Sequence, residues 1–161
     1  MAPNLLILLA AALVPMVMGF IWYNPKTLGN AWMKAADVTE EKMKGANMGL
    51  IFGLSFLFSF FLAFALNGIV IHQWGLFSLV GGNEEAFNAI MSADVMSEYK
   101  DGFRTFGHGV LHGVITGFTI ALPIMATNAM FERKGFKYIA INVGYWIITL
   151  GLMGGIICQW A

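Results

Sequence analysis

The sequence predicts an all-α integral membrane protein, a bundle of four transmembrane helices with both termini outside and short interfacial helices between the spans. Hydrophobic residues make up 58% of the 161 residues and charged residues only 11%, whereas soluble domains carry roughly 25% charged residues. Charged residues are also absent from four long stretches, residues 1–25, 45–83, 105–131 and 138–161. Each stretch is long enough for the roughly 20 residues that a helix needs to cross the hydrocarbon core.

We expect a single transmembrane domain over residues 1–161, with helices at about residues 5–23, 40–71, 102–130 and 136–159. The first helix ends before Pro25, because the residue before a proline avoids helical torsions. The second begins after Thr39, a capping residue followed by two acids that favour the helix dipole. Residues 1–25 lack a basic start and a convincing cleavage site, so we interpret them as a retained span and not as a signal peptide.

The connections between the spans predict the orientation. Seven of the nine basic residues lie in the connections at residues 26–44 and 132–137, while five of the nine acidic residues lie between the second and third spans. Basic connections stay on the cytoplasmic side, so both termini are expected outside. The apolar residues 71–82 and the amphipathic residues 84–93 are expected to lie on the outer membrane surface.

Composition and motifs exclude several classes of function. The net charge is zero, so no overall field attracts nucleic acid. A single cysteine, Cys158, excludes an intrachain disulfide and a cysteine-rich metal site. The sequence contains no phosphate-binding glycine loop, no zinc-protease motif and no nucleophile elbow. We therefore assign no catalytic residue, expect a protein that is not an enzyme, and leave its cofactors unknown.

Glycines recur at four-residue spacing on three of the predicted helices. Small residues let membrane helices approach each other closely, so these rows predict helix packing. The helices that pack there belong to one bundle, to a homo-oligomer or to a larger membrane complex, and the sequence leaves these alternatives open. The rows are Gly45, Gly49 and Gly53, then Gly109, Gly113 and Gly117, then Gly151 and Gly155.

A polar stripe runs along the third predicted helix. At about 100° per residue its members share roughly one third of the helix circumference. Polar groups in hydrocarbon face the bundle interior or a wet cavity, so the stripe is expected to point towards the second and fourth helices. Its members are Arg104, Thr105, His108, His112, Thr116 and Thr119.

The three histidines are the candidate metal or cofactor site. His72 lies near the outer end of the second helix, and His108 and His112 lie near the outer start of the third, so an antiparallel hairpin brings them together. Histidines four residues apart on a helix can chelate one metal ion, and Asp101 or Glu98 could add a carboxylate. Alternatively, the histidines are neutral and form hydrogen bonds across the bundle.

Two segments resemble a known family. The first runs from Gly19 through the residues Trp22-Tyr23-Asn24-Pro25 to Glu41, and the second covers residues 141–155 of the last helix. Both are similar to a family of small bacterial membrane proteins known only as domain of unknown function family 1761. The resemblance implies a four-helix protein of the bacterial inner membrane, and it implies no reaction.

Three hypotheses of function follow. The first is a non-enzymatic membrane protein of unknown role that acts as a homo-oligomer or as an accessory subunit of a larger membrane complex. The second is a small ligand-binding or redox protein with a metal, haem or quinone at the histidines. The third is a small transporter or channel, which the lack of an inverted repeat disfavours. The lipid bilayer and other membrane proteins are the expected partners, and nucleic acid is not.

Overall fold

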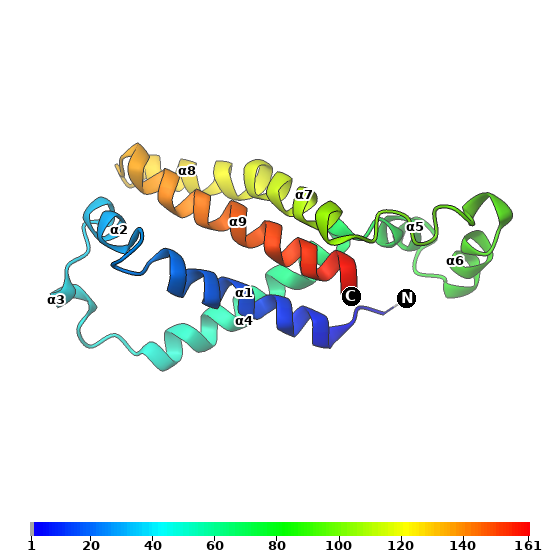
Figure 1. The fold of residues 1–161 in the computed structure, drawn as a ribbon, viewed down its shortest axis with the longest axis horizontal. Helices are drawn as coiled ribbons and strands as arrows, with labels where there is room; N and C mark the ends of the chain where they lie inside the picture. Colours follow the sequence, from blue (N-terminus) through cyan, green and yellow to red (C-terminus); the bar gives the residue numbers. More distant parts are fainter. Residues whose placement is uncertain (1) are drawn as a thin grey trace.

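Four long helices form the structure, a computed structural model that describes residues 2–161 (Figure 1). They are α1 (Leu5–Trp22), α4 (Met48–Val70), a third span over Phe106–Phe131, and α9 (Phe136–Trp160), and each is long and apolar enough to cross a membrane. Residues 2–161 form helices and turns and contain no β-strand. The prediction of an all-α protein with four membrane-spanning helices is confirmed, while the orientation of the termini stays a prediction.

Short helices lie in the connections. The helices α2, α3 and the turn before α9 lie at one end of the molecule, which we call the α2 end (Figure 1). The helices α5 and α6 and both termini lie towards the other end, the α5 end. The bounds are Gly29–Ala36 for α2, Glu40–Met43 for α3, Gln73–Leu79 for α5, Glu84–Met91 for α6 and Asp94–Met96 for the 3-10 turn η1.

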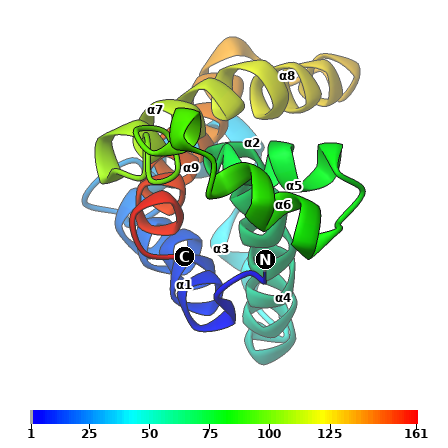
Figure 2. The ribbon, with the colours of Figure 1, turned by 90° about the vertical axis from the view of Figure 1, so that its right-hand side faces the viewer.

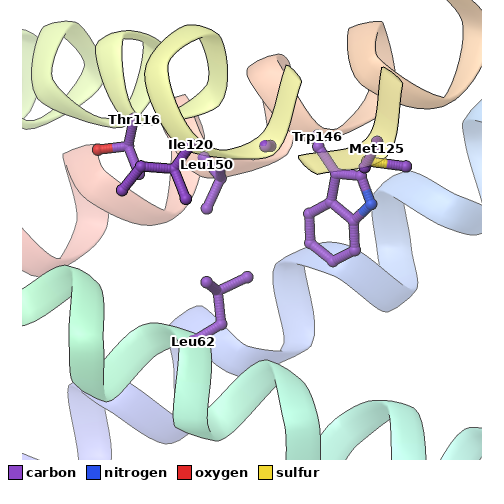
Figure 3. Close-up of a pocket in the computed structure, with 7 residues that line it drawn as sticks. Leu62, Thr116, Ile120, Met125, Trp146 and Leu150 are labelled. Carbon is purple, nitrogen blue, oxygen red and sulfur yellow. The ribbon is translucent and has the colours of Figure 1, made fainter. Parts of the chain in front are cut away.

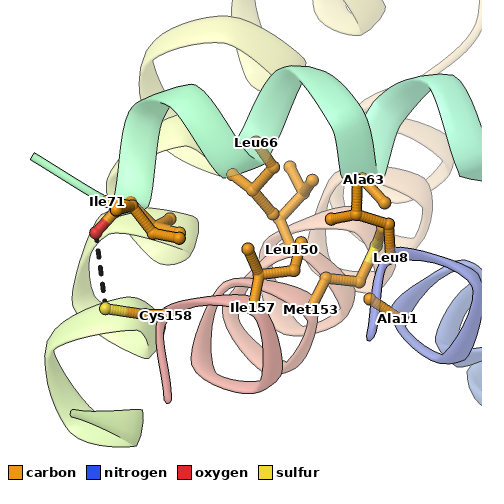
Figure 4. Close-up of a cluster of buried hydrophobic side chains, with 10 residues drawn as sticks. Leu8, Ala11, Ala63, Leu66, Ile71, Leu150, Met153, Ile157 and Cys158 are labelled. Atoms are coloured by element: carbon orange, nitrogen blue, oxygen red, sulfur yellow. Dashed lines mark hydrogen bonds between the residues drawn. The ribbon is translucent and has the colours of Figure 1, made fainter. Parts of the chain in front are cut away.

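The helix α9 is the centre of the fold. It packs against α1, α4 and the third span. In the view from the α5 end it lies between α1 and α7 (Phe106–Thr116), the first part of the third span (Figure 2). Its buried face forms a core with α1 and α4 near the α5 end (Figure 4). That core consists of Leu8, Ala11, Ala63, Leu66, Val70, Ile71, Leu150, Met153, Ile157 and Cys158.

The second span begins later than we expected. Thr39 caps a helix as predicted, since its hydroxyl accepts the N–H of Lys42 at 3.3 Å, but α3 ends at Met43. Gly45 follows with φ of +86°, a left-handed conformation that interrupts the helix. Asn47 then caps α4 by accepting the N–H of Leu50 at 3.0 Å. The helix expected at residues 40–71 is therefore two helices, and Gly45 lies outside the packing row in which we placed it.

The third span begins at Phe106, four residues later than expected. Thr105 is the N-cap, because its hydroxyl accepts the N–H of His108 at 3.2 Å. Phe103 has φ of +64°, a conformation that a non-glycine residue adopts only at an energetic cost. This turn separates the loop at the α5 end from the helix that follows it.

Arg104 does not lie on the polar stripe of the third span, where we expected it. It precedes the helix, and its guanidinium donates to the carbonyls of Cys158, at 2.8 Å from Nε, and of Ala161. The last carbonyls of a helix lack partners within the helix and carry partial negative charge. Arg104 therefore satisfies the end of α9 and joins it to the loop before α7.

The third span contains a π-helical turn. It comprises α7 (Phe106–Thr116), η2 (Gly117–Ala121) and α8 (Leu122–Phe131), and the N–H of Leu122 donates to the Gly117 carbonyl five residues earlier. Pro123 explains the wider turn, because proline lacks an N–H and clashes with the carbonyl four residues before it.

The threonines of the predicted stripe bond their own helix. The hydroxyl of Thr116 donates to the His112 carbonyl and that of Thr119 to the Ile115 carbonyl, each at 2.8 Å. Thr116 also lines a cavity of about 260 Å³ beside the π-helical turn (Figure 3). The other residues that line this cavity are Leu62, Ile120, Ala121, Met125, Trp146 and Leu150.

Two glycines let α7 and α9 meet backbone to backbone. A Cβ on Gly109 would overlap the carbonyl oxygen of Gly154, and a Cβ on Gly113 would overlap that of Leu150. Close approach of this kind is how small residues join membrane helices. The two glycines therefore fix the rotation of α7 about its axis, and this rotation decides where its histidines point.

The remaining glycines of the predicted rows differ in their surroundings. A Cβ on Gly117 would crowd α9, and a Cβ on Gly151 or Gly155 would crowd α7. A Cβ on Gly49 would meet only the side chain that caps its own helix, and a Cβ on Gly53 would have nothing within 4 Å. Gly49 and Gly53, in the first half of α4, therefore do not pack against another helix of the same chain.

Candidate metal centre

The three histidines of the chain converge at the α5 end. His72 directly precedes α5, after α4 has ended at Val70, and His108 and His112 lie one turn apart near the start of α7. The Nε2 atom of His72 lies 3.2 Å from that of His108 and 3.3 Å from that of His112. The three ligand atoms all lie within 4.8 Å of one another, so the structure brings together the residues that we predicted as a site.

Two of these separations, from His72 to His108 and from His72 to His112, match the edge of a tetrahedral metal site. Zinc–nitrogen bonds of 2.0–2.1 Å at tetrahedral angles place two ligand nitrogens about 3.3–3.4 Å apart. Without a cation, the Nε2 atom of a neutral His72 either donates one proton or accepts with one lone pair. It therefore forms a hydrogen bond with only one of the two ring nitrogens that it faces. A metal ion can accept all three lone pairs at once and leaves a fourth position open.

The group contains no carboxylate. Asp101 and Glu98 were expected as possible extra ligands, but among the described residues the cluster within ligand distance consists of the three histidines alone. The loop before α7 places the ring of Phe103, and not a carboxylate, against the histidines. The donor set is therefore nitrogen only, which suits zinc, copper, nickel or iron and not magnesium or calcium.

Phe103 covers the cluster from the loop before α7. Its ring centroid lies 5.8 Å from that of His72 and 5.0 Å from that of His108. The left-handed backbone at Phe103 directs the ring onto the histidines, and strained conformations of this kind cluster at ligand sites. The sequence contains no signal for this conformation, because phenylalanine is not a residue that favours positive φ.

Cys158 joins the two segments that present the histidines. Its thiol lies 3.3 Å from the carbonyl oxygen of Val70, at the end of α4, and 3.2 Å from that of Phe103 (the core around Cys158 is drawn in Figure 4). Cys158 is fully buried. The sequence does not reveal this contact, because the partners of Cys158 are two backbone carbonyls and no side-chain pattern marks them.

A small cavity borders the cluster on the α5 side. It has a volume of about 170 Å³, and His72 and Phe103 are among its lining residues. Gln73 also lines it and donates from Nε2 to the Lys100 carbonyl at 2.9 Å, while its buried Oε1 has no partner within the described residues. The remaining lining residues are Leu76, Met91, Met96, Tyr99 and Gly102.

The geometry excludes a haem that has two of these histidines as its axial ligands. Two axial ligands of a haem lie on opposite faces of the macrocycle, whereas the Nε2 atom of His72 lies within 3.2–3.3 Å of those of His108 and His112. No macrocycle fits between rings this close. A single small ion, by contrast, can lie between ring nitrogens this close.

The fold and the histidine cluster define a small membrane protein whose four spans include one central helix. The family model described as "Protein of unknown function (DUF1761)" matches residues 6–158, so the chain belongs to this family and the resemblance seen in its sequence is confirmed. No curated protein and no solved structure matches the chain.

Proposed function

We propose that this membrane protein binds a divalent transition metal ion, foremost Zn²⁺, through His72, His108 and His112. The observation that supports this proposal is the pair of Nε2–Nε2 distances, 3.2 and 3.3 Å, which agree with the edge of a tetrahedral zinc site. Zinc imposes no geometry of its own and accepts three imidazoles with a fourth ligand from solvent. His72 is exposed, so water can reach that fourth position.

The charge distribution supports a location for the site. The α2 end contains seven basic and four acidic residues, and the α5 end contains two basic and five acidic residues. The more basic end of a bacterial inner-membrane protein faces the cytoplasm. With both termini outside, the metal site lies at the outer side of the inner membrane, next to an acidic surface that attracts cations.

Metal binding by purified protein tests the proposal. We expect one Zn²⁺ per chain, and we expect His72→Ala, His108→Ala and His112→Ala each to lower the affinity by more than about 100-fold, because loss of even an indirect partner of a ligand costs 10–100-fold. Asn88→Ala, on the exposed surface of α6, is the matched control. A metal-free protein whose histidine variants lose only stability would instead mean that the histidines are hydrogen-bonded core residues.

A second proposal concerns association with other membrane helices, as a homo-oligomer or as an accessory subunit. Gly49 and Gly53 have no neighbouring helix, although they lie on the apolar span α4. Small-residue rows without a partner are where membrane helices dock. Native mass spectrometry and cross-linking should detect a complex that Gly53→Leu disrupts. Gly68→Leu is the control, because Gly68 also has open space around it but lies outside the row of Gly49 and Gly53.

A further inference from the structure

We propose that the groove between α1 and α4 binds one anionic phospholipid, with its acyl chains in the groove and its headgroup at the α2 end. The groove has a volume of about 870 Å³. Its walls are α1 and the first half of α4, and residues of α9 form its floor. The two walls cross and then diverge towards the α2 end (Figure 1).

One wall of the groove is fixed to the floor. Tyr145 on α9 donates from its hydroxyl to the Pro15 carbonyl of α1 at 2.7 Å. At the end of α1, Trp22 donates from Nε1 to the Ile141 carbonyl at 3.0 Å. These two bonds hold the second half of α1 against α9. The groove therefore opens between α1 and α4.

The other wall stands away from the bundle. Every residue of α4 from Met48 to Phe58 is exposed or half-buried, and burial begins at Ser59. The first half of α4 therefore leans out while its second half packs in the core. Among membrane-spanning helices such a gap is filled by hydrocarbon, because an empty apolar space loses the dispersion contacts of its lining.

The lining favours hydrocarbon over a polar ligand. Its walls are apolar, with Phe20 on α1 and Phe52 on α4 among the lining residues. The two phenol groups in it are already engaged, since Tyr145 donates to Pro15 and Tyr23 donates to Asn142 Oδ1 at 2.9 Å. Burial, together with the neighbouring tyrosines, raises the pKa of Tyr23, so its phenol stays protonated and keeps this bond. The remaining hydroxyls of the lining, those of Ser55 and Ser59, are uncharged, so an anionic headgroup finds its charged partners outside the groove.

The charge at the mouth of the groove selects the headgroup. Trp32 and Met48 line the groove where it reaches the α2 end, which has three more basic than acidic residues. Lysine-rich segments at a membrane surface attract anionic lipids, and aromatic residues such as Trp32 lie at headgroup level. Three exposed lysines of this segment can contact a headgroup. They are Lys26, Lys34 and Lys44.

The test places the protein in nanodiscs of equal phosphatidylglycerol and phosphatidylcholine and measures retained lipid by native mass spectrometry after release into detergent. We expect one phosphatidylglycerol per chain. Ser55→Phe puts a ring into the groove from an exposed position of α4 and should abolish retention. Leu57→Phe, an exposed position of the same helix outside the groove, should retain the lipid.

Replacing Lys26, Lys34 and Lys44 by glutamine tests the headgroup. We expect the triple variant to lose the preference for phosphatidylglycerol, with the two lipids retained equally. Quenching of tryptophan fluorescence by lipids with brominated chains gives a second reading, because Trp32 and Trp146 line the groove, and Ser55→Phe should reduce it. Zinc binding of Ser55→Phe should be unchanged, which separates this proposal from that of the metal site.

Several outcomes would overturn the proposal. These are no retained lipid in the wild-type protein, equal retention of both lipids by the wild-type protein, or retention that Ser55→Phe leaves intact. A dimer that forms in the wild-type protein and is lost in Ser55→Phe would also overturn it, because a second copy of the chain would then occupy the groove.

Discussion

The thiol of Cys158 lies 3.3 Å from the carbonyl oxygen of Val70, two residues before His72. The same sulfur lies 3.2 Å from the carbonyl oxygen of Phe103, five residues before His108. One buried side chain at the end of α9 therefore connects the two segments from which the histidines of the candidate metal centre come. This relationship makes Cys158 a positioning residue in our account.

The first prediction concerns Cys158. We expect Cys158→Ala to destabilise the protein by about 1–3 kcal/mol, because it removes the thiol donor to the Val70 carbonyl, whereas the Phe103 carbonyl still accepts the N–H of Thr105. We also expect it to lower zinc affinity by about 10–100-fold, as loss of a positioning group does in other metal sites. Cys158→Ser retains a donor and should restore most of the affinity. Zinc titration and unfolding in detergent measure the two effects, and unchanged zinc affinity in Cys158→Ala would contradict the role.

The second prediction concerns the contact between α7 and α9. Gly113→Ala should destabilise the protein by about 1–3 kcal/mol, because its Cβ would overlap the Leu150 carbonyl and force the helices apart. Gly107→Ala lies in the same helix with nothing within 4 Å, and it should be neutral or stabilising by up to about 1 kcal/mol, since alanine favours helix over glycine. Equal effects of the two substitutions on thermal unfolding would show that the helices do not meet at Gly113.

The third prediction separates strain from ring contact at Phe103. Phe103→Gly and Phe103→Ala both remove the ring that covers the histidines, and we expect both to weaken zinc binding. Glycine adopts φ of +64° without the cost that alanine meets, so Phe103→Gly should be the more stable of the two variants by about 1 kcal/mol. Unfolding and zinc titration of both variants are the measurements. Greater stability of the alanine variant would show that the backbone there is not left-handed.

The fourth prediction concerns orientation. In a Cys158→Ser background, we expect the thiol of Ser97→Cys to react with an impermeant reagent on intact spheroplasts. The thiol of Lys44→Cys should react only after the membrane is opened, because the basic α2 end faces the cytoplasm. Both engineered positions are exposed in the structure. The reverse pattern of labelling would place the metal centre on the cytoplasmic side.

The four spans were predictable because burial in hydrocarbon excludes charge over about 20 residues at a time, and the four charge-free stretches mark that exclusion directly. The boundaries were less predictable. Thr39 is a genuine cap, but the helix it starts ends before Gly45, whose left-handed φ depends on how the connection closes. The late start of α7 likewise follows from the cap at Thr105.

The candidate site was predictable in part. Spacing on one helix and antiparallel packing placed His72, His108 and His112 together, and the structure brings their ring nitrogens together. Periodicity could not reveal that Arg104 leaves the stripe to bond the end of α9. It also could not reveal the roles of Phe103 and Cys158, because these depend on a backbone conformation and on backbone carbonyls.

X-ray absorption spectroscopy of the zinc-loaded protein tests the central claim most directly. Our account predicts one bound zinc with nitrogen ligands at about 2.0–2.1 Å, including the imidazole signature of three histidines, and its loss when His72, His108 and His112 are all replaced by alanine. Zinc bound by oxygen ligands, or the same spectrum from the triple variant, would contradict the account.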